Sequence, residues 1–456
     1  MNKKTSKDLT TGPIWRKLWD LSAPMILGII AVLSVNLVDT YFVAQLGTEN
    51  LAAISFTFPV TFTIMSLAIG LSGGAASLVS RSIGAKDEEE SKRLSTDSLV
   101  LSFLIVLFAS VFGYFTITPL FQLIGAKNEV LDLLTQYMGI WYISMPFLVI
   151  PMVANALIRA NGDAIWPSAI MILSALINII LTPMFIEGWT FIPAMAIKGA
   201  AVSTLISQMI TFVMALMIVI FKEKMISFEI PPLSDTLRSW RKVLRIAGPS
   251  ALGNMVNPAS IGIVTAFIAG FGDVTVAAFG AATRIESFIV IPMLALSSAI
   301  GPISGQNWGA GNKDRVRLAL KQTYIACFIW ALISGVFVML TSDWIARQFT
   351  HDPAVLKEIT QYLIIIPLSL WGYGVSINAA ASYNALGKPL WGLAYYLMRA
   401  GLFYVPLSFF AVHFYGHIEA VFWAIVLANV LGGVLIAFAT LTKTNAEKPQ
   451  GELSVA

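Results

Sequence analysis

The chain has 456 residues, of which 57% are hydrophobic and only 12% are charged, and its mean hydropathy is +0.79. A soluble globular protein has about 25% charged residues, so these values exclude a soluble enzyme or binding protein. The net charge of +4 resides mainly in loops, which indicates membrane topology rather than nucleic-acid binding.

Apolar runs of about 20 residues, the length of a helix that crosses the hydrocarbon core of a bilayer, occur twelve times. We therefore predict an all-α membrane protein with twelve transmembrane helices. In chain order they cover residues 18–45, 51–80, 97–122, 132–158, 165–186, 195–221, 246–270, 275–303, 318–342, 357–384, 390–413 and 419–441.

Basic residues collect on one side of this topology. They occur at the amino terminus, in alternate loops and in the tail, at Lys3, Lys4, Lys7, Arg16, Lys17, Lys86, Lys92, Arg93, Lys222, Lys224, Arg238, Arg241, Lys242, Lys313, Arg315, Arg317, Lys443 and Lys448. The opposite loops carry Glu49, Glu129, Glu187 and Asp273. The positive-inside rule places both termini in the cytoplasm, and we expect a multi-pass protein of the bacterial inner (plasma) membrane.

A polar cytoplasmic linker, residues 223–240, separates two halves that resemble each other. Equivalent residues lie 225 positions apart: Pro24 and Pro249, Gly28 and Gly253, Gly47 and Gly272, IGA at 83–85 and WGA at 308–310, LTQY at 134 and ITQY at 359, Gly162 and Gly387, and Trp166 and Trp391. Six helices separate equivalent points, so both halves enter the membrane from the same side. We predict two six-helix bundles, residues 1–222 and 241–442, related by a parallel repeat, and a disordered tail at 443–456.

The sequence shows no sign of an enzyme or a zinc centre. Cys327 is the only cysteine, and the three histidines, His351, His413 and His417, fall at or beyond the predicted outer helix ends. We find no Gly-rich phosphate loop and no nucleophile elbow. We therefore predict no catalytic residues, no cofactor and no metal other than a coupling ion.

Two loop motifs carry a resemblance to a known family. VSRSIGAKDEEE follows the second helix and GQNWGAGN follows the eighth, and with the twelve helices in parallel halves they resemble the multidrug and toxic compound extrusion (MATE) family over nearly the whole chain. Asp39 on helix 1 and NxxxxP from Asn178 to Pro183 resemble its prokaryotic DinF-like branch. Helices 7 and 10 lack the acidic residues of the branch known for sodium-driven norfloxacin export. The resemblance implies a secondary antiporter whose first helix bends at Pro24.

Asp39 is a carboxylate inside the first predicted helix. An ionised Asp near the bilayer centre costs about 2.5–3.5 kcal/mol, so its presence requires an explanation. The repeat supplies a control, because Val264 occupies the equivalent position in a helix that keeps the proline and the glycine. The fold therefore does not need this carboxylate, and we interpret Asp39 as functional. Pro24 recurs as Pro249, so its bend is either architectural or a gating hinge.

Polar residues on neighbouring helices are expected to surround Asp39. Asn178 and Thr182 lie four apart and share one face of helix 5, while Asn155 is on helix 4 and Thr204 on helix 6. The resemblance implies a second Asp where Thr182 stands, as part of a sodium site. Because burial favours the neutral form of a lone carboxyl group, we expect H⁺ as the coupling ion. Na⁺ held by Asp39, Asn178, Thr182 and Thr204 is the alternative.

Three further charges, Arg284, Glu286 and Arg399, lie deep in apolar sequence of the second half. Arg284 and Glu286 are two apart on a helix and point to different faces, so we do not expect them to pair with each other. Each charge is either part of a structural ion pair with a neighbouring helix or a substrate contact.

We predict a monomeric antiporter in the lipid bilayer that exports amphipathic, often cationic drugs in exchange for protons and so confers drug resistance, without a nucleic-acid partner. A lipid-linked saccharide flippase of the wider superfamily is one alternative, but it would need a cavity rich in Arg and Lys. A membrane-embedded enzyme is another, and it would need a clustered nucleophile, base or metal set.

Overall fold

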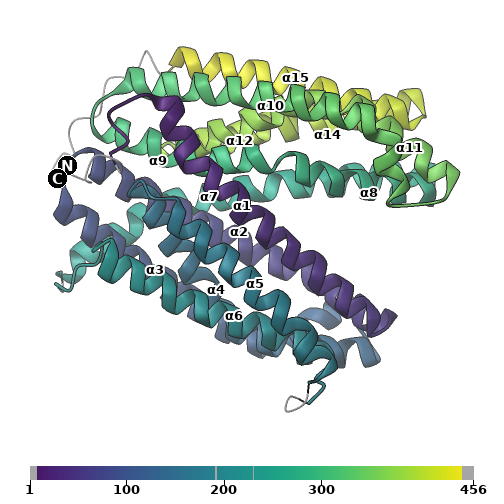
Figure 1. The fold of residues 1–456 in the computed structure, drawn as a ribbon, viewed down its shortest axis with the longest axis horizontal. Coiled ribbons are helices and arrows are strands. Elements are labelled where there is room, and N and C mark those ends of the chain that lie inside the picture. Colours follow the sequence, from purple (N-terminus) through teal and green to yellow (C-terminus); the bar gives the residue numbers. More distant parts are fainter. Residues whose placement is uncertain (1–7, 190–192, 230, 444–456) are drawn as a thin grey trace. The chain divides into compact units, whose positions relative to one another are not determined.

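The computed structural model describes residues 8–189, 193–229 and 231–443, and its elements in these ranges are helices (Figure 1). The predicted tail therefore lies outside the described residues, apart from Lys443. The helices are α1 (Ile14–Gln45), α2 (Thr48–Gly84), α3 (Glu88–Leu123), α4 (Asn128–Ala160), α5 (Ile165–Glu187), α6 (Ile197–Met217), η2 (Ile218–Lys222), α7 (Leu233–Ile268), η3 (Ala269–Phe271), α8 (Asp273–Ile289), α9 (Ile291–Gly309), α10 (Lys313–Arg347), α11 (Pro353–Ile365), η4 (Pro367–Ser369), α12 (Leu370–Ala385), α13 (Pro389–Leu397), η5 (Met398–Tyr404), α14 (Val405–Phe410), η6 (Ala411–Tyr415) and α15 (Ile418–Lys443).

The membrane-spanning pattern agrees with the sequence. Among the described residues, eleven helical segments are long and apolar enough to cross a membrane, and the bent pair α8 and α9 provides a twelfth. The all-α, twelve-span fold class is thus confirmed. Several helices begin before the predicted apolar run, as α7 does at Leu233 and α10 at Lys313, because polar residues continue a helix beyond the hydrocarbon region.

The eighth predicted helix, residues 275–303, is not continuous. The chain bends by 46° between α8 and α9, and Val290 is the only residue between them. Pro292 lies in the first turn of α9. Its ring clashes with the carbonyl four residues earlier and it donates no hydrogen bond, so the uninterrupted span that we expected was wrong at a proline visible in the sequence.

Contacts divide the chain into two compact units. Pro24–Val79 and Asp87–Gly248 form one unit, which we call the Asp39 unit. In it α4 packs against α3 and α6, and α6 also packs against α5 (Figure 1). The other, which we call the Arg399 unit, comprises the residues up to Ala23, Ser80–Lys86 and the chain from Pro249 onward. In it α12 contacts α9, α13 and α15, and α10 contacts α9, α11 and α12.

These units differ from the linear halves 1–222 and 241–442. The chain passes from one unit to the other between Ala23 and Pro24, inside α1, and again between Gly248 and Pro249, inside α7. The two prolines are 225 residues apart. The sequence repeat predicts where each copy begins, but it does not tell which helices the first turns of α1 contact.

The ends of α2 and α9 meet inside the Arg399 unit in a contact that repeats itself. A Cβ atom on Gly84 would clash with the backbone of Gln306, and one on Gly309 would clash with the backbone of Arg81. Arg81 and Gln306 are repeat equivalents, as are Gly84 and Gly309, because each pair is 225 residues apart. The two contacts are therefore copies of one another.

The GQNWGAGN motif serves this packing and also holds the segment before α1. Gln306 Oε1 accepts a hydrogen bond from the Leu9 backbone N–H at 3.1 Å, and Asn307 Nδ2 donates to the Leu9 carbonyl at 3.0 Å. Gln306 and Asn307 are buried, so these bonds satisfy groups that would otherwise be unpaired. The glycines of the motif allow the backbone of α2 to pack closely against α9. The side-chain amides of the motif hold the amino-terminal segment by hydrogen bonds.

Candidate functional site

Asp39 of α1 is bound by a hydroxyl group of α5. Thr182 Oγ1 donates a hydrogen bond to Asp39 Oδ1 at 2.9 Å. Thr182 is fully buried, with 0% of its surface exposed, whereas Asp39 is half-buried. Within the described ranges no other hydrogen bond reaches the carboxyl group, so its second oxygen is available to carry a proton.

The polar chain continues from Thr182 into α6. Thr182 Oγ1 lies 3.3 Å from Asn178 Oδ1 and 2.9 Å from the hydroxyl of Ser203, and Asn178 Nδ2 donates to Thr204 Oγ1 at 3.2 Å. The hydroxyl groups of Ser203 and Thr204 each donate to the Ala200 carbonyl at 2.9 Å. We call these residues, Asp39, Thr182, Asn178, Ser203 and Thr204, the Asp39 chain.

The geometry of α1 and α5 explains why Asp39 meets Thr182. The Ser168 hydroxyl donates to the Pro24 carbonyl, and a Cβ atom on Gly28 would lie 3.2 Å from Met171 Sδ. Contacts therefore advance in the same order along both helices, which run parallel and side by side. Pro24 is contacted by α5, and its role as a hinge stays a prediction.

Apolar and aromatic residues pack beside this site, toward the carboxyl ends of α1 and α5. Val43 of α1, Ile186 of α5 and Ala200 of α6 form a buried cluster, and Tyr137 of α4 packs against it. Tyr137 also interacts electrostatically with Asp39. Sequence reasoning missed both Tyr137 and Ser203. The spacing of Ala200, Ser203 and Ser207 offered a signal for Ser203, since small residues three and four apart share one helix face.

Asn155 does not join the Asp39 chain. It is 18 residues beyond Tyr137 on α4, which is a separation of roughly 27 Å along a helix axis. Its side-chain oxygen is buried and lacks a hydrogen-bond partner among the described residues. The prediction that Asn155 lies beside Asp39 was therefore wrong, because it considered which helices carry polar residues and not their depth.

Of the three charged residues of the second half, Arg284 lies apart, whereas Glu286 and Arg399 interact electrostatically. Arg284 on α8 is exposed. Glu286, on the same helix, accepts a hydrogen bond from the Tyr362 hydroxyl. Arg399 in the π-helical segment η5 is buried, with 4% of its surface exposed, and its guanidinium donates to two asparagines. Among the described residues none of the three forms a salt bridge within 4.0 Å, so of the two alternatives the direct structural ion pair is not found there.

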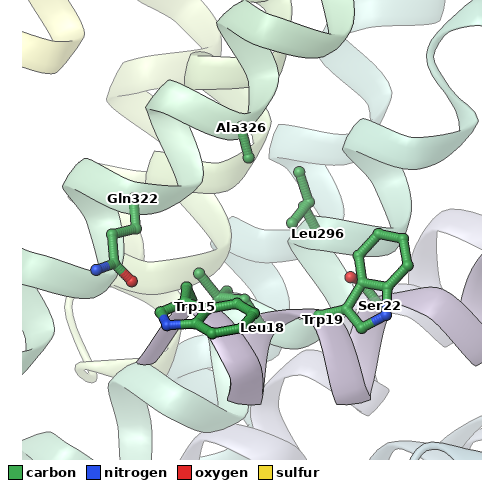
Figure 2. Close-up of a pocket in the computed structure, with 7 residues that line it drawn as sticks. All are labelled: Trp15, Leu18, Trp19, Ser22, Leu296, Gln322 and Ala326. Carbon is green, nitrogen blue, oxygen red and sulfur yellow. The ribbon is translucent and has the colours of Figure 1, made fainter. Parts of the chain in front are cut away.

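A small cavity lies in the Arg399 unit, and its lining includes no residue of the Asp39 chain. It has a volume of about 260 Å³ and is lined by Trp15, Leu18, Trp19 and Ser22 of α1 and by Leu296, Gln322 and Ala326. Figure 2 shows these α1 side chains facing Leu296 of α9 and the two residues of α10. This volume is below the roughly 300–1,000 Å³ of sites for drug-sized ligands, so the cavity is a packing gap between α1, α9 and α10.

Comparison with known proteins decides the family. The MatE family model matches residues 24–184 and 249–410, which together exceed half of the chain and begin at the two repeated prolines. The chain belongs to the MATE family. The FAD transporter of Shewanella oneidensis is 36% identical over 94% of this chain and 95% of that protein. The probable multidrug resistance protein YoeA of Bacillus subtilis is 26% identical over 88% of each chain.

Solved MATE structures share the fold. The structure of a mutant of the Vibrio cholerae MATE transporter VcmN superimposes with a TM-score of 0.90 and 27% identity, over 95% of this chain and 98% of that one. The resemblance to the MATE family that GQNWGAGN and the repeat carry is thus confirmed. This MATE protein belongs to a family of membrane transporters for small molecules.

Proposed function

We propose that this MATE protein is a proton-coupled exporter of planar aromatic compounds of the flavin type, FAD among them. The observation that supports the coupling is the Asp39 chain, a single half-buried carboxyl group inside a membrane-spanning helix with a hydroxyl donor on one oxygen. A buried ionisable residue in a membrane helix marks an ion pathway in most transporters.

The hydrogen-bonding capacity of Thr182 links the charge of Asp39 to α6. Thr182 has one hydroxyl proton, and Asp39, Asn178 and Ser203 all present an oxygen within 3.3 Å. A charged carboxylate is the strongest acceptor of the three. When Asp39 is protonated it becomes a donor, and the Thr182 proton turns to Asn178 or Ser203. Protonation from outside thus rearranges bonds on three helices, and it can shift a conformational equilibrium.

The substrate class is supported by the relatives. The Shewanella protein, named for FAD transport, is 36% identical to this chain, compared with 26% for the multidrug protein YoeA. Amphipathic cations are a second candidate class, favoured by the relatives named for multidrug export and by Asp39, which among the described residues has no basic partner within 4.0 Å.

Sodium is the less favoured coupling ion. A sodium site would need several oxygen ligands around the ion, and Asp39 is the only carboxylate in the Asp39 chain. Asn178 and Thr182 already use their polar groups for one another and for α6. The inner-membrane location, the cytoplasmic termini and a monomeric state are parts of the same proposal, and they rest on the distribution of basic residues and the family.

The test is export from proteoliposomes under defined gradients. We expect a pH gradient alone to drive FAD export and a sodium gradient alone to drive little. Asp39→Asn should reduce pH-driven export by at least about tenfold, since the amide is nearly isosteric but cannot titrate. Asp20→Asn, at an exposed position of the same helix, is the matched control and should export normally. Sodium-driven export at equal rate with the pH gradient collapsed, or an active Asp39→Asn protein, would contradict the coupling.

A further inference from the structure

Arg399 is a permanently charged side chain buried in a membrane-spanning segment. It lies in η5, inside the span Pro389–Tyr415, and 4% of its surface is exposed. Arginine does not lose its proton in proteins, and a charge at such a position is unfavourable unless it has a partner. In the part of the chain that the structure describes, no carboxylate lies within 4.0 Å of its guanidinium.

Neutral groups hold the guanidinium in place. Arg399 Nη1 donates to Asn429 Oδ1 of α15 at 2.6 Å, and Nη2 donates to Asn257 Oδ1 of α7 at 2.5 Å. Asn429 is fixed in turn by a bond from its Nδ2 to the Ser369 hydroxyl at 2.9 Å. These amides orient the side chain, but they supply no negative charge.

Aromatic rings and a glycine complete the site. The guanidinium carbon lies 4.7 Å from the ring centre of Tyr373 and 5.5 Å from that of Tyr404. Gly432 is closely packed, because a Cβ atom there would lie 2.9 Å from Arg399 Cγ. Asn257 and Tyr373 are only half-buried, so they form the less covered side of the site.

The fold does not require this arginine. The residue 225 positions earlier is Ser174, and the partner Asn257 corresponds to Val32. Glu286 interacts electrostatically with Arg399 but forms no salt bridge with it within 4.0 Å, and its carboxylate accepts a hydrogen bond from the Tyr362 hydroxyl. Two of the five guanidinium N–H donors point to the asparagines, which leaves donors for an incoming anion.

We propose that Arg399, with Asn257 and Tyr373, binds the phosphate group of a flavin nucleotide as the substrate passes through the Arg399 unit. The inference rests on the proposed export of flavins. The planar guanidinium fork matches the oxygens of a phosphate, and an anionic ligand supplies direct charged hydrogen bonds, which the two amides do not and Glu286, beyond 4.0 Å, does not. Asp39 then senses the proton, and Arg399 distinguishes phosphorylated from unphosphorylated substrates.

The experiment compares two flavins that differ only in a phosphate. FMN and riboflavin are titrated against purified full-length protein in lipid nanodiscs, and binding is followed by flavin fluorescence. The wild type should bind FMN about 10–100 times more tightly than riboflavin, as expected for a charged hydrogen bond. Arg399→Gln should bring this ratio close to 1 and leave riboflavin affinity unchanged, whereas Arg399→Lys should keep part of it. Arg347→Gln, which removes an exposed surface charge, should keep all of it.

Each outcome separates the site from the transport function. A wild type that binds FMN and riboflavin equally would overturn the inference even if FAD export is observed. Equal loss of both flavins in Arg399→Gln, with a lower melting temperature, would show that Arg399 only holds α7 and α15 together. A wild type that prefers FMN but exports no flavin under any gradient would retain the binding site and overturn the proposed function.

Discussion

At the residue scale, the hydroxyl of Thr182 occupies the position at which charge on α1 meets polar groups of α5 and α6. The side chain is fully buried, so water does not compete for its proton. Asp39 is the charged acceptor and Asn178 the neutral one. The sequence resemblance implies a carboxylate at this position, and the structure shows how a hydroxyl replaces a second charge with a donor.

Thr182→Val tests this role, because valine keeps the shape and removes the hydroxyl. We expect proton-driven export to fall several-fold, since the unpaired Asp39 and Asn178 oxygens are left with a desolvation cost of about 1–3 kcal/mol. Thr182→Ser should restore most of the activity. The readout is the rate of proton-driven export in proteoliposomes, measured together with the proton movement that a pH-sensitive dye reports.

Thr211→Val is the control for this substitution. Thr211 is on α6 and donates only to the Ser207 carbonyl, at 2.7 Å, so its loss removes a hydroxyl without affecting Asp39. If Thr182→Val and Thr211→Val behaved alike, the Asp39 chain would have no part in coupling.

At the element scale, the crossing of α2 and α9 depends on two glycines, at each of which the backbone of the other helix approaches closely. Gly84 and Gly309 each face the main chain of the other helix, and main-chain atoms cannot move aside as a side chain would. A methyl group at either position must separate the helix ends or bend them. The family motif after the eighth helix is therefore explained by packing rather than by chemistry.

Gly309→Ala should destabilise the protein by about 1–3 kcal/mol, the usual range for overpacking. Gly301→Ala provides the comparison on the same helix, because a Cβ atom there has its nearest neighbour at 4.0 Å. We expect a clearly lower melting temperature in detergent for Gly309→Ala and little change for Gly301→Ala. Equal melting temperatures would contradict the close contact with Arg81.

The helices and the repeat could be predicted because they follow from patterns along the sequence. Apolar run length locates the spans, and the 225-residue spacing locates the repeat. Asp39 and Thr182 were found because helix periodicity and the apolar counterpart Val264 distinguish them. The position of a residue along the membrane normal could not be predicted as well. Asn155 lies far along α4 from Tyr137, and no pattern in the sequence tells which residues of different helices lie at the same depth.

Sequence reasoning also missed partners that are ordinary residues by composition. Ser203 is a small residue in an apolar helix. Tyr137 ends the repeated LTQY motif, but the repeat does not show that its side chain lies beside Asp39. Arg399 was identified as a buried charge, but its bonds to Asn257 and Asn429 join helices far apart in the chain. Such contacts depend on how helices pack, which a single sequence does not specify.

At the scale of the whole molecule, the distribution of charged loops predicts which side of the membrane each loop faces. Single-cysteine labelling in a Cys327→Ala background tests it. Asp273→Cys, at the exposed first residue of α8, should react with a membrane-impermeant maleimide on intact cells. Glu89→Cys, exposed at the start of α3, should react only after lysis. The opposite labelling pattern would reverse the orientation and with it the direction of proton flow.

The contact between Ser80 and Gly305 has a consequence for the history of the two halves. These residues are equivalent by the repeat, and a Cβ atom on Gly305 would meet the Ser80 side chain, so one sequence position touches its own copy. In a dimer of identical half-length chains, a residue larger than glycine here would collide with itself, and a carboxylate in one subunit would be present in both. Fusion into one chain removes that constraint. Each copy is then free to diverge, so that one half carries Asp39 opposite a valine, and the other carries Arg399 opposite a serine.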